Sequence, residues 1–515
     1  MTAARLGAAT VRSLGAGVAV PAYDRSAISV GIVHFGTGAF VRSHQAMYLD
    51  RLLAAGKALD WGICAVDVLP SDRPKERWFA EQDGLYTLMI KEADGTISPR
   101  VIGSLADHLY APEVPDLVLG RLTDPRTRIV TLTITEGGYS LHPVTGEFDP
   151  QDPAVAHDLL PGVVPRSVFG FITEALRRRR AAGVPAFTVV SCDNLQGNGK
   201  LALRVFSAFA ERADPEFGRW VRDHVSFPNS MVDRITPVTT AEDTARLEAE
   251  FGIEDAWPVV CEPFAQWVLE DQFPAGRPPW EDSGVQLVAD VTPYELMKLR
   301  LLNAGHQALA YAGYLAGYRY AHEAAADPVF AEFVTGYMQQ EARPTLEPVP
   351  GVDLDDYIET LMLRFGNEAV RDTLARLCAA SSDRIPKWLL PVIRRNLATG
   401  GPVARSAAIV ASWARYAEGT DEAGQPIDVV DAARDEVMAM ARRQHEEPLS
   451  FVRNERLFGD LAEQPRFAEA YLSALAALHH DGAAQMLRQL NAELAGPVGG
   501  PSHDHGLSCS GPASG

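Results

Sequence analysis

The sequence contains little cysteine and no cysteine cluster. Five cysteines are spread over its 515 residues, at positions 64, 192, 261, 378 and 509, and no two of them form a C-x-x-C pair. Neither a disulfide framework nor a cysteine-based zinc site is therefore expected. Most of these cysteines lie in apolar segments, where we expect them to be small buried hydrophobic residues.

Long apolar runs are also absent. No stretch approaches the roughly 18 apolar residues that a membrane-spanning helix requires. The N-terminus carries Arg5 and Arg12 in a segment rich in alanine and glycine. It lacks the sustained apolar run and cleavage site of a signal peptide. These absences predict a cytoplasmic protein that has no membrane partner.

The chain has no excess of positive charge. It contains 47 Lys and Arg against 67 Asp and Glu, which gives a formal net charge of −20. Nucleic acids and anionic membranes are bound by basic surfaces, so neither is expected as a partner. A hydrophobic fraction of 47% and a charged fraction of 22% are typical of a globular protein. The length exceeds that of one ordinary core and suggests two domains.

The first half of the chain alternates strand and helix patterns. ISVGIVHFGTGAF (28–40) is an apolar run that ends in a glycine turn, VRSHQAMYLDRLLAAG (41–56) has helical spacing, and WGICAVDV (61–68) predicts a buried strand. This order is typical of the start of a Rossmann fold. Further strands are predicted at 85–92, 128–135 and 187–193, and a helix at 167–183, which together indicate a mostly parallel sheet.

The second half is almost entirely helical. Helices are predicted at 293–318, 327–340, 354–365, 367–379, 386–398, 402–416, 428–446, 464–476 and 483–494. The predicted class is therefore α/β, with an N-terminal Rossmann-type dinucleotide-binding domain followed by a mostly α-helical C-terminal domain. The expected boundaries are a leader at 1–27, the Rossmann-type domain at 28–290, the helical substrate and catalytic domain at 291–495, and a low-complexity, disordered tail at 496–515.

The glycine turn predicts a dinucleotide site. Gly36 and Gly38 form a G-x-G pattern, whereas Val41 stands where a third glycine is common. The first glycine permits the tight bend, and the second lets backbone N–H groups approach a pyrophosphate. A plain strand-to-helix turn is the alternative. We expect NAD to contact the turn through Gly36, Thr37, Gly38, Ala39, Phe40 and Arg42.

Two acidic residues near the end of the second strand bear on the choice of cofactor. Asp67 closes that strand and Asp72 follows it. Either carboxylate could accept hydrogen bonds from ribose hydroxyls and repel a 2′-phosphate, which favours NAD over NADP. Arg73 weakens that preference, so NADP stays possible. The alternative is that both aspartates cap the following helix.

The segment YELMKLRLLNAGHQALAY (294–311) places polar side chains in an otherwise apolar helix. Around a regular helix, Glu295, His306 and Asn303 lie about 60°, 80° and 140° from Lys298. Burial would lower the pKa of that lysine, so that its neutral amine could act as a general base. Asn303 could stabilise a developing oxyanion, His306 could orient it, and Glu295 could pass protons to water. The alternative is an interdomain helix whose polar groups make structural hydrogen bonds.

Six segments together resemble a known family. They are GTGAFVRSHQAMYLD (36–50), TITEGGYS (133–140), SCDNLQGNGK (191–200), FPNSMVDRITP (227–237), VCEPFAQWVLED (260–271) and KLRLLNAGH (298–306). In this order they resemble the polyol-specific long-chain dehydrogenases, the mannitol 2-dehydrogenase family, over about residues 28–490. The turn of that family has the form G-x-G-x-F-x-R-x-H, which explains the absence of a third glycine.

The resemblance implies the chemistry and the residues that perform it. It implies oxidation of a sugar alcohol such as D-mannitol to its ketose, D-fructose, and the reverse reduction, with NAD(P), without a metal and by a monomer. Lys298, Asn303 and His306 match the catalytic set, Asn194 matches a second oxyanion donor, and Glu295 matches a proton relay. Asp233, Arg376 and Arg384 match substrate-binding positions, although relatives often carry lysine where Arg384 stands.

Several alternatives remain open at this stage. Asn194 could be a turn former, and Asp233 could form an ion pair with its neighbour Arg234. The substrate could be arabinitol, sorbitol, a sugar acid such as fructuronate or tagaturonate, or a sugar-alcohol phosphate. A zinc alcohol dehydrogenase would need ligand spacings that the sequence lacks. A nucleotide-binding protein without turnover is the remaining rival.

Overall fold

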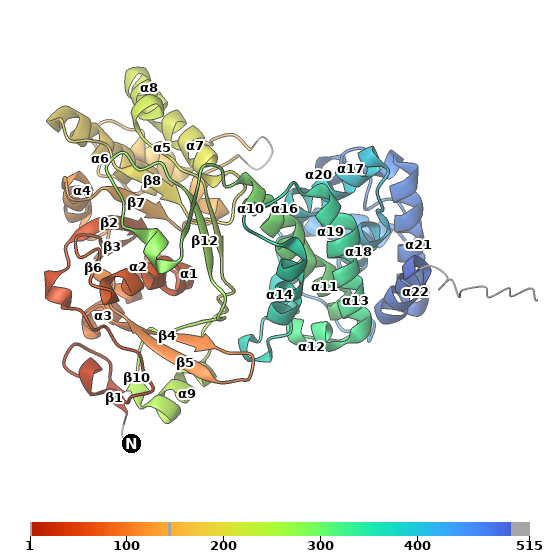
Figure 1. Ribbon diagram of the computed structural model, residues 1–515. Helices are drawn as coiled ribbons and strands as arrows, with labels where there is room; N and C mark the ends of the chain where they lie inside the picture. Colours follow the sequence, from red (N-terminus) through yellow and green to blue (C-terminus); the bar gives the residue numbers. More distant parts are fainter. Residues whose placement is uncertain (1–2, 143–145, 496–515) are drawn as a thin grey trace, which may run out of the picture. The chain divides into compact units, whose positions relative to one another are not determined.

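The computed structural model describes residues 3–142 and 146–495, so the predicted tail at 496–515 lies outside the described residues. These residues form two compact units (Figure 1). The first extends to Asn303 and includes Leu346–Asp372. The second comprises Ala304–Thr345 and the described chain from Thr373 onward.

The first unit contains the predicted parallel sheet, which is confirmed. Its five strands stand in the order β6-β3-β2-β7-β8, and all neighbours are parallel. The chain moves outward from β2 in one direction and then returns to β7 on its other side. The carboxyl ends of β2 and β7 therefore flank a topological switch point, where Rossmann folds bind their ligands. The strands are β2 (Val30–Phe35), β3 (Gly62–Asp67), β6 (Leu105–Tyr110), β7 (Ile129–Leu132) and β8 (Thr188–Ser191).

Helices cover both faces of this sheet. Val33 and Phe35 of β2 pack with helices α4 (Pro115–Thr123), α6 (Val168–Ala182) and α7 (Asn198–Ala213). Ile32, the residue before Val33, packs on the opposite face with α2 (Gln45–Ala54). Side chains alternate along a strand, so a continuous apolar run is what a sheet covered on both faces requires.

Not every predicted strand joins the central sheet. The strand predicted at 85–92 is β4 (Tyr86–Lys91), and it lies in a separate sheet between β5 (Ile97–Ile102) and β11 (Val259–Cys261). A further sheet has β12 (Gln266–Glu270) between β9 (Ser230–Asp233) and β13 (Gln286–Val288). The short strand β9 carries the S-M-V-D sequence to the candidate site.

The described part of the predicted leader belongs to the fold. Strand β1 (Ala4–Arg5) pairs with β10 (Ile253–Glu254). Leu6, Val11 and Val18 are buried in a small core that also contains Ile253. The other helices of this unit are α1 (Ala39–Ser43), α3 (Arg73–Glu81), α5 (Pro153–Asp158), α8 (Pro215–His224), α9 (Ala241–Phe251), α10 (Thr292–Met297) and α14 (Leu354–Phe365).

Two predicted helices are interrupted. The helix expected at 41–56 is broken at His44, where φ is −120° and ψ is −87°, into α1 and α2. The helix expected at 293–318 consists of α10, a π-helical segment η6 (Lys298–Asn303) and α11 (Ala304–Leu315). A π-helical turn changes the angle between successive side chains, so the arc calculated for a regular helix does not hold here. Such turns often occur at functional sites.

The second unit is helical, as predicted. Its helices are α11, α12 (Ala321–Ala326), α13 (Pro328–Gly336), α15 (Leu374–Cys378), α16 (Ser381–Trp388), α17 (Leu390–Thr399), α18 (Ala404–Tyr416), α19 (Arg434–Arg443), α20 (Glu455–Phe458), α21 (Pro465–Asp481) and α22 (Ala483–Ala495). The two units divide after Asn303, and Leu346–Asp372 belongs to the first unit, so this division differs from the predicted boundary at 290.

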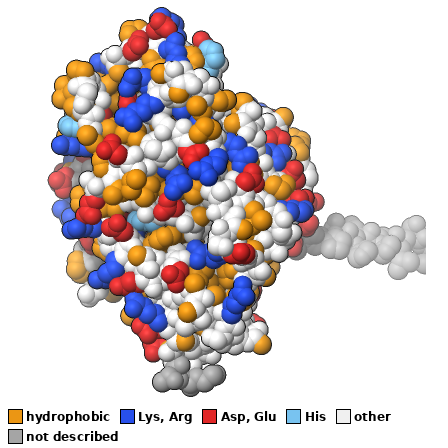
Figure 2. Space-filling model, turned by 90° about the vertical axis from the view of Figure 1, so that its left-hand side faces the viewer, with side chains coloured by type: hydrophobic (Ala, Val, Ile, Leu, Met, Phe, Trp, Pro, Cys, Tyr) orange, Lys and Arg blue, Asp and Glu red, His pale blue; other side chains and the backbone are white. Residues whose placement is uncertain are grey.

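Two surface properties bear on possible partners. None of the helices in the described chain is long and apolar enough to cross a membrane. On the face shown in Figure 2, acidic and basic side chains are interspersed among hydrophobic and uncharged ones.

Candidate active site

The glycine turn after β2 lies at the topological switch point. Gly36 has φ +90°, and a Cβ at this position would lie 2.1 Å from the backbone oxygen of Thr133, just beyond β7. Only glycine fits such a position. A Cβ at Gly38, by contrast, would meet no atom closer than 4.0 Å. The second glycine is exposed and leaves open space beside the backbone, which suits the approach of a pyrophosphate.

Asp67 holds this turn from the neighbouring strand. Its carboxylate accepts hydrogen bonds from the backbone N of Thr37 (2.8 Å), from Nε2 of His108 (2.9 Å) and from Nζ of Lys75 (3.2 Å). Burial alone would raise the pKa of Asp67, but these donors together lower it. The structure thus gives Asp67 a role in positioning the turn, and its contact with ribose stays a prediction.

Asp72 occupies the N-cap position of α3, but its side chain makes no capping hydrogen bond to that helix. Its carboxylate accepts from the backbone N of Leu69 (3.3 Å) and pairs with Lys75 (2.8 Å) at the start of α3. No contact of Asp72 with the turn is present among the described hydrogen bonds.

Arg42 and Phe40 support the turn from within the protein. The guanidinium of Arg42 donates to the backbone oxygens of Trp257 (2.5 Å) and Gly38 (3.3 Å), and it lies 4.1 Å from the Trp257 ring centre. Phe40 stacks on His44 at 4.9 Å. Burial lowers the pKa of His44 to about 3, so this imidazole is neutral and packs without taking part in proton transfer.

A cavity lies beyond the carboxyl ends of β3 and β6. Its volume is about 560 Å³, and Val68, Ala111, Pro112 and Phe171 are among the residues that line it. Val68 directly follows Asp67. The volume and the apolar lining are typical of a small-molecule site.

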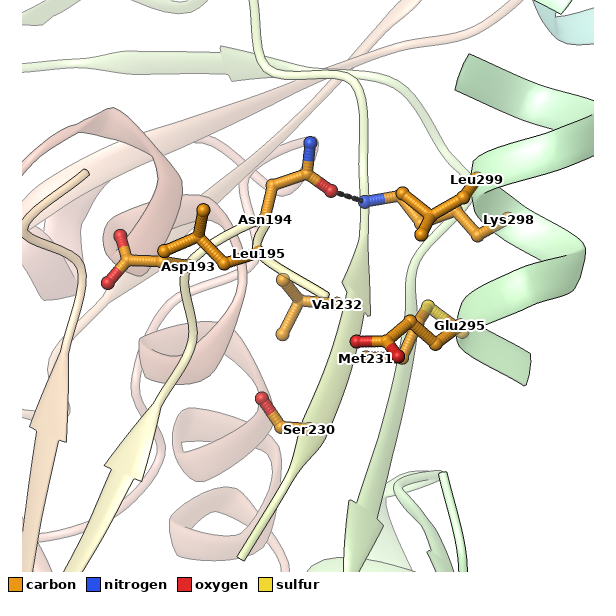
Figure 3. A pocket seen from close by; sticks show the side chains of 9 residues that line it. All are labelled: Asp193, Asn194, Leu195, Ser230, Met231, Val232, Glu295, Lys298 and Leu299. Carbon is orange, nitrogen blue, oxygen red and sulfur yellow. Dashed lines mark hydrogen bonds between the residues drawn. The ribbon is translucent and has the colours of Figure 1, made fainter. Parts of the chain in front are cut away.

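Lys298 is the centre of the second part of the site. Its Nζ donates a hydrogen bond to Oδ1 of Asn194 at 2.6 Å, and the residue is only 8% exposed (Figure 3). Burial lowers the pKa of this lysine, and the positive charge of Arg364 lowers it further, against opposing effects of Asp233 and Glu295. A lowered pKa increases the fraction of neutral amine, the form that can accept a proton.

The loop that carries Asn194 follows β8 and is held by its neighbours. Asp193 accepts from the backbone N of Thr135 (2.8 Å) and from the hydroxyl of Tyr139 (2.7 Å). Asn198 exchanges hydrogen bonds with the backbone of Ser230 in β9, at 2.8 and 2.9 Å. Asn198 is therefore a structural residue of the turn, whereas the side chain of Asn194 is aimed at Lys298.

Glu295 shares a small cavity with Lys298. Its Oε1 accepts from the backbone N of Gly197 at 2.6 Å, and burial raises its pKa to about 7. The cavity, about 10 Å³, is lined by Asp193, Asn194, Leu195, Ser230, Met231, Val232, Glu295, Lys298 and Leu299 (Figure 3). That is room for roughly one water molecule. A single water there would connect the carboxylate with the amine.

The raised pKa of Glu295 allows a test of its predicted role as a proton relay between Lys298 and water. Glu295 must be ionised to accept a proton, so its effect on the rate of oxidation should rise with pH through about 7. Glu295→Gln keeps the acceptor for Gly197 but cannot ionise. We expect the turnover of this variant to fall by about 10- to 100-fold and its pH profile to lose the inflection that belongs to Glu295. An unchanged inflection, measured by kcat from pH 5.5 to 10, would contradict the relay.

Asn303 ends the π-helical segment with an unused donor. It is 7% exposed, and its amide nitrogen is buried without a hydrogen-bond partner among the described residues. A buried donor without a partner is unfavourable by about 1–3 kcal/mol. A substrate oxygen would satisfy it. His306 lies in α11, in the second unit, and is 8% exposed.

Asp233 forms an ion pair with Arg364, a residue to which the sequence patterns gave no role. Arg364 of α14 binds both carboxylate oxygens of Asp233, at 2.8 and 2.9 Å, and also pairs with both oxygens of Glu262, at 2.9 and 2.7 Å. All three side chains are buried. Arg234 instead donates to backbone oxygens, including that of Glu262 at 3.0 Å. The ion pair expected as an alternative therefore exists, but with Arg364 and not with Arg234.

The two remaining predicted residues lie in the second unit. Arg376 is an exposed residue of α15, and Arg384 is a half-buried residue of α16. The guanidinium of Arg384 donates to the backbone oxygens of Arg376 (3.3 Å) and Leu377 (3.4 Å). The structure thus brings these two positions together, and their contact with substrate stays a prediction.

Family models match both halves of the chain. The mannitol dehydrogenase Rossmann domain matches residues 30–282, and the mannitol dehydrogenase C-terminal domain matches residues 290–479. Mannitol 2-dehydrogenase of Phaeosphaeria nodorum is 45% identical over 476 residues, which cover 92% of this chain and 83% of that protein.

Two solved structures are similar over nearly the whole chain. A Pseudomonas fluorescens mannitol 2-dehydrogenase, solved as a ternary complex with NAD and D-mannitol, has 43% sequence identity and a TM-score of 0.88, over 96% of this chain and 100% of that one. A D-sorbitol dehydrogenase solved in substrate-free form has 37% identity and a TM-score of 0.85, over 94% and 100%.

Proposed function

Because the chain belongs to the mannitol dehydrogenase family, we propose that it oxidises D-mannitol to D-fructose with NAD and catalyses the reverse reduction. The observation that carries this proposal is the buried Lys298, whose lowered pKa and hydrogen bond to Asn194 suit a general base. A sequence-wide similarity to mannitol 2-dehydrogenases supports the choice of substrate.

The first unit fits a dinucleotide. The open space at Gly38 and the cavity beyond β3 and β6 lie on the carboxyl side of the parallel sheet. The segment from Gly36 to Arg42, with Asp67 and Asp72 close by in sequence, would hold the cofactor. NAD⁺, when bound, supplies the acceptor for the hydride that leaves the carbinol carbon.

Lys298 and the side chains around it remove the hydroxyl proton and stabilise the oxygen that it leaves. The neutral amine of Lys298 takes the hydroxyl proton. Because the amide oxygen of Asn194 accepts from Lys298, its NH₂ group is left to donate to the alkoxide-like oxygen. The unpaired NH₂ of Asn303 is the second donor, and such donors contribute about 3–4 kcal/mol each to similar reactions. No metal is needed to activate the hydroxyl, because an amine supplies the base.

The remaining residues of the proposed site have four further roles. His306 orients the reacting oxygen, and Glu295 passes the proton from Lys298 to water. Arg376 and Arg384 bind hydroxyl groups of the sugar alcohol. Asp233 contributes an acceptor whose negative charge is shared with Arg364, which suits an uncharged polyol better than a sugar acid.

D-sorbitol is a second candidate substrate. The similarity to a D-sorbitol dehydrogenase at 37% identity and a TM-score of 0.85 supports it. We further propose that the protein is a monomer of the cytoplasm, which its acidic net charge and its small number of cysteines support.

Steady-state kinetics with a panel of substrates tests the proposal. NADH formation is measured with mannitol, sorbitol and arabinitol, and NADH consumption with fructose and with fructuronate and tagaturonate. We expect the highest kcat/KM for mannitol and fructose with NAD, and a lower value with NADP. A preference for sorbitol would select the second candidate, and a preference for the sugar acids, or no turnover with any polyol, would overturn both.

A further inference from the structure

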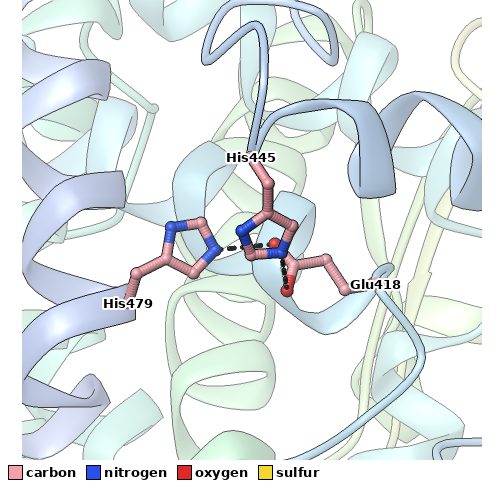
Figure 4. Close-up of side chains that lie close together, drawn as sticks. All are labelled: Glu418, His445 and His479. Atoms are coloured by element: carbon pink, nitrogen blue, oxygen red, sulfur yellow. Dashed lines mark hydrogen bonds and ion pairs between the residues drawn. The ribbon is translucent and has the colours of Figure 1, made fainter.

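Three potential metal ligands converge in the second unit, and none of them has been assigned a role above. Glu418 follows α18, His445 follows α19, and His479 lies in the last turn of α21 (Figure 4). Both imidazole rings face the same carboxylate. The three residues come from separate elements, which is why no spacing motif reveals them in the sequence.

The distances suit a small cation. Nε2 of His445 lies 3.4 Å from Oε2 of Glu418, and Nε2 of His479 lies 2.7 Å from Oε1. All three ligand atoms lie within 4.8 Å of one another. Tetrahedral zinc binds nitrogen and oxygen at about 2.0–2.2 Å, which places neighbouring ligand atoms about 3.3–3.6 Å apart. Shifts of less than about 1.5 Å would bring these atoms to that spacing.

Neighbouring side chains orient the carboxylate. Gln444 donates to Oε1 of Glu418, and the hydroxyl of Tyr471 donates in turn to the amide oxygen of Gln444 at 3.2 Å. Partners that fix a ligand in this way are typical of metal sites. Arg415 lies 3.2 Å from Oε2, and its charge opposes a cation. The same guanidinium nitrogen also donates to the backbone oxygen of Thr420 at 2.8 Å.

We propose that Glu418, His445 and His479 form a zinc site. Two imidazoles and one carboxylate are a ligand set that zinc favours, and the fourth position is open to solvent because the His445 side chain is 59% exposed. The ion joins the ends of α18 and α19 to α21 and stabilises the second unit. It takes no part in the chemistry at Lys298, so this proposal does not depend on the proposed function.

Zinc titration of the untagged full-length protein tests the site. All variants carry His503→Ala and His505→Ala, which removes the two histidines of the C-terminal tail. After removal of metal with a chelator, calorimetry should show one zinc ion per chain. We expect His445→Ala and His479→Ala each to weaken binding by at least 100-fold. His480→Ala is the matched control, because His480 neighbours His479, is 86% exposed and pairs with Asp481; it should bind zinc as the parent does.

Two further measurements separate the outcomes. X-ray absorption at the zinc edge should show nitrogen and oxygen ligands without sulfur, and zinc should raise Tm of the parent and of His480→Ala but not of His445→Ala. His445 is exposed, so its substitution should leave Tm of the metal-free protein unchanged and keep the comparison valid if His479→Ala folds poorly. Equal zinc affinity in His445→Ala and His480→Ala, sulfur ligation, or no saturable binding would overturn the proposal.

Discussion

Replacing Lys298 by methionine should lower kcat for polyol oxidation by at least about 10³-fold, because among the described residues no other amine lines the cavity at Glu295. The loss should occur in kcat, while NADH binding, measured by fluorescence titration, stays within about twofold. Lys57→Met is the matched control, since Lys57 pairs with Asp282 at the surface. Turnover of Lys298→Met near that of the parent, or a loss in affinity alone, would contradict the assignment.

The same variant should not lose thermal stability at neutral pH. The pKa of Lys298 is lowered in the folded state, mainly by burial, so the unfolded chain binds this proton more tightly. The buried lysine therefore opposes folding at pH values below its unfolded pKa of about 10.4. That effect decreases as the pH rises from the lowered pKa of the folded state to the unfolded value, and it is absent above the unfolded value. Methionine fills a similar volume without a charge. The Tm of Lys298→Met at pH 7 should therefore equal or exceed that of the parent.

The pH dependence of the parent enzyme follows from the same group. Oxidation needs the neutral amine, so kcat/KM should rise with pH through the lowered pKa of Lys298, and reduction should fall over the same range. Adding small primary amines to Lys298→Ala should restore part of the oxidation rate, with the neutral form of the added amine as the active species.

Sequence patterns predicted those parts of the fold that depend on local chemistry. The apolar run before Gly36 and the alternation that follows led to the parallel sheet, because buried strands and tight turns restrict residue choice. The strand at 86–91 was also predicted, but its place in another sheet depends on pairing with Val259–Cys261, far along the chain. Pairing partners of that kind leave no periodic signal.

The candidate site shows the same limit. Lys298 and Asn303 were selected on regular helical spacing, yet a π-helical segment from Lys298 to Asn303 sets their actual directions. The bond between Lys298 and Asn194 joins residues 104 positions apart. The two residues were assigned to one site from the family motifs, because no sequence pattern indicates that they are in contact. Nothing marked Arg364, whose partners Asp233 and Glu262 lie on other elements, except that a charged residue interrupts the apolar pattern of LMLRF.

Arg364 should matter for both stability and rate. Removing one partner from a buried ion network leaves uncompensated charge and typically destabilises by about 3–5 kcal/mol. Arg364→Ala should therefore lower the free energy of unfolding by that amount in urea denaturation. Arg177→Ala removes a surface arginine that pairs with Glu174 and should change it by less than about 1 kcal/mol.

The effect of Arg364 on rate acts through the pKa of Lys298. The arginine lowers that pKa, whereas Asp233 and Glu295 raise it. In Arg364→Ala the carboxylates of Asp233 and Glu262 are left unneutralised, so the ammonium form of Lys298 is favoured and its pKa rises. The limb of kcat/KM for oxidation should then move to higher pH, with a loss of about tenfold at pH 7 for each unit of displacement and recovery at alkaline pH. Arg364→Lys keeps the charge but cannot bridge two carboxylates, so it should be destabilised while its limb stays near that of the parent. If kcat/KM rises over the same pH range in Arg364→Ala, Arg364→Lys and the parent, then Arg364 acts on stability alone.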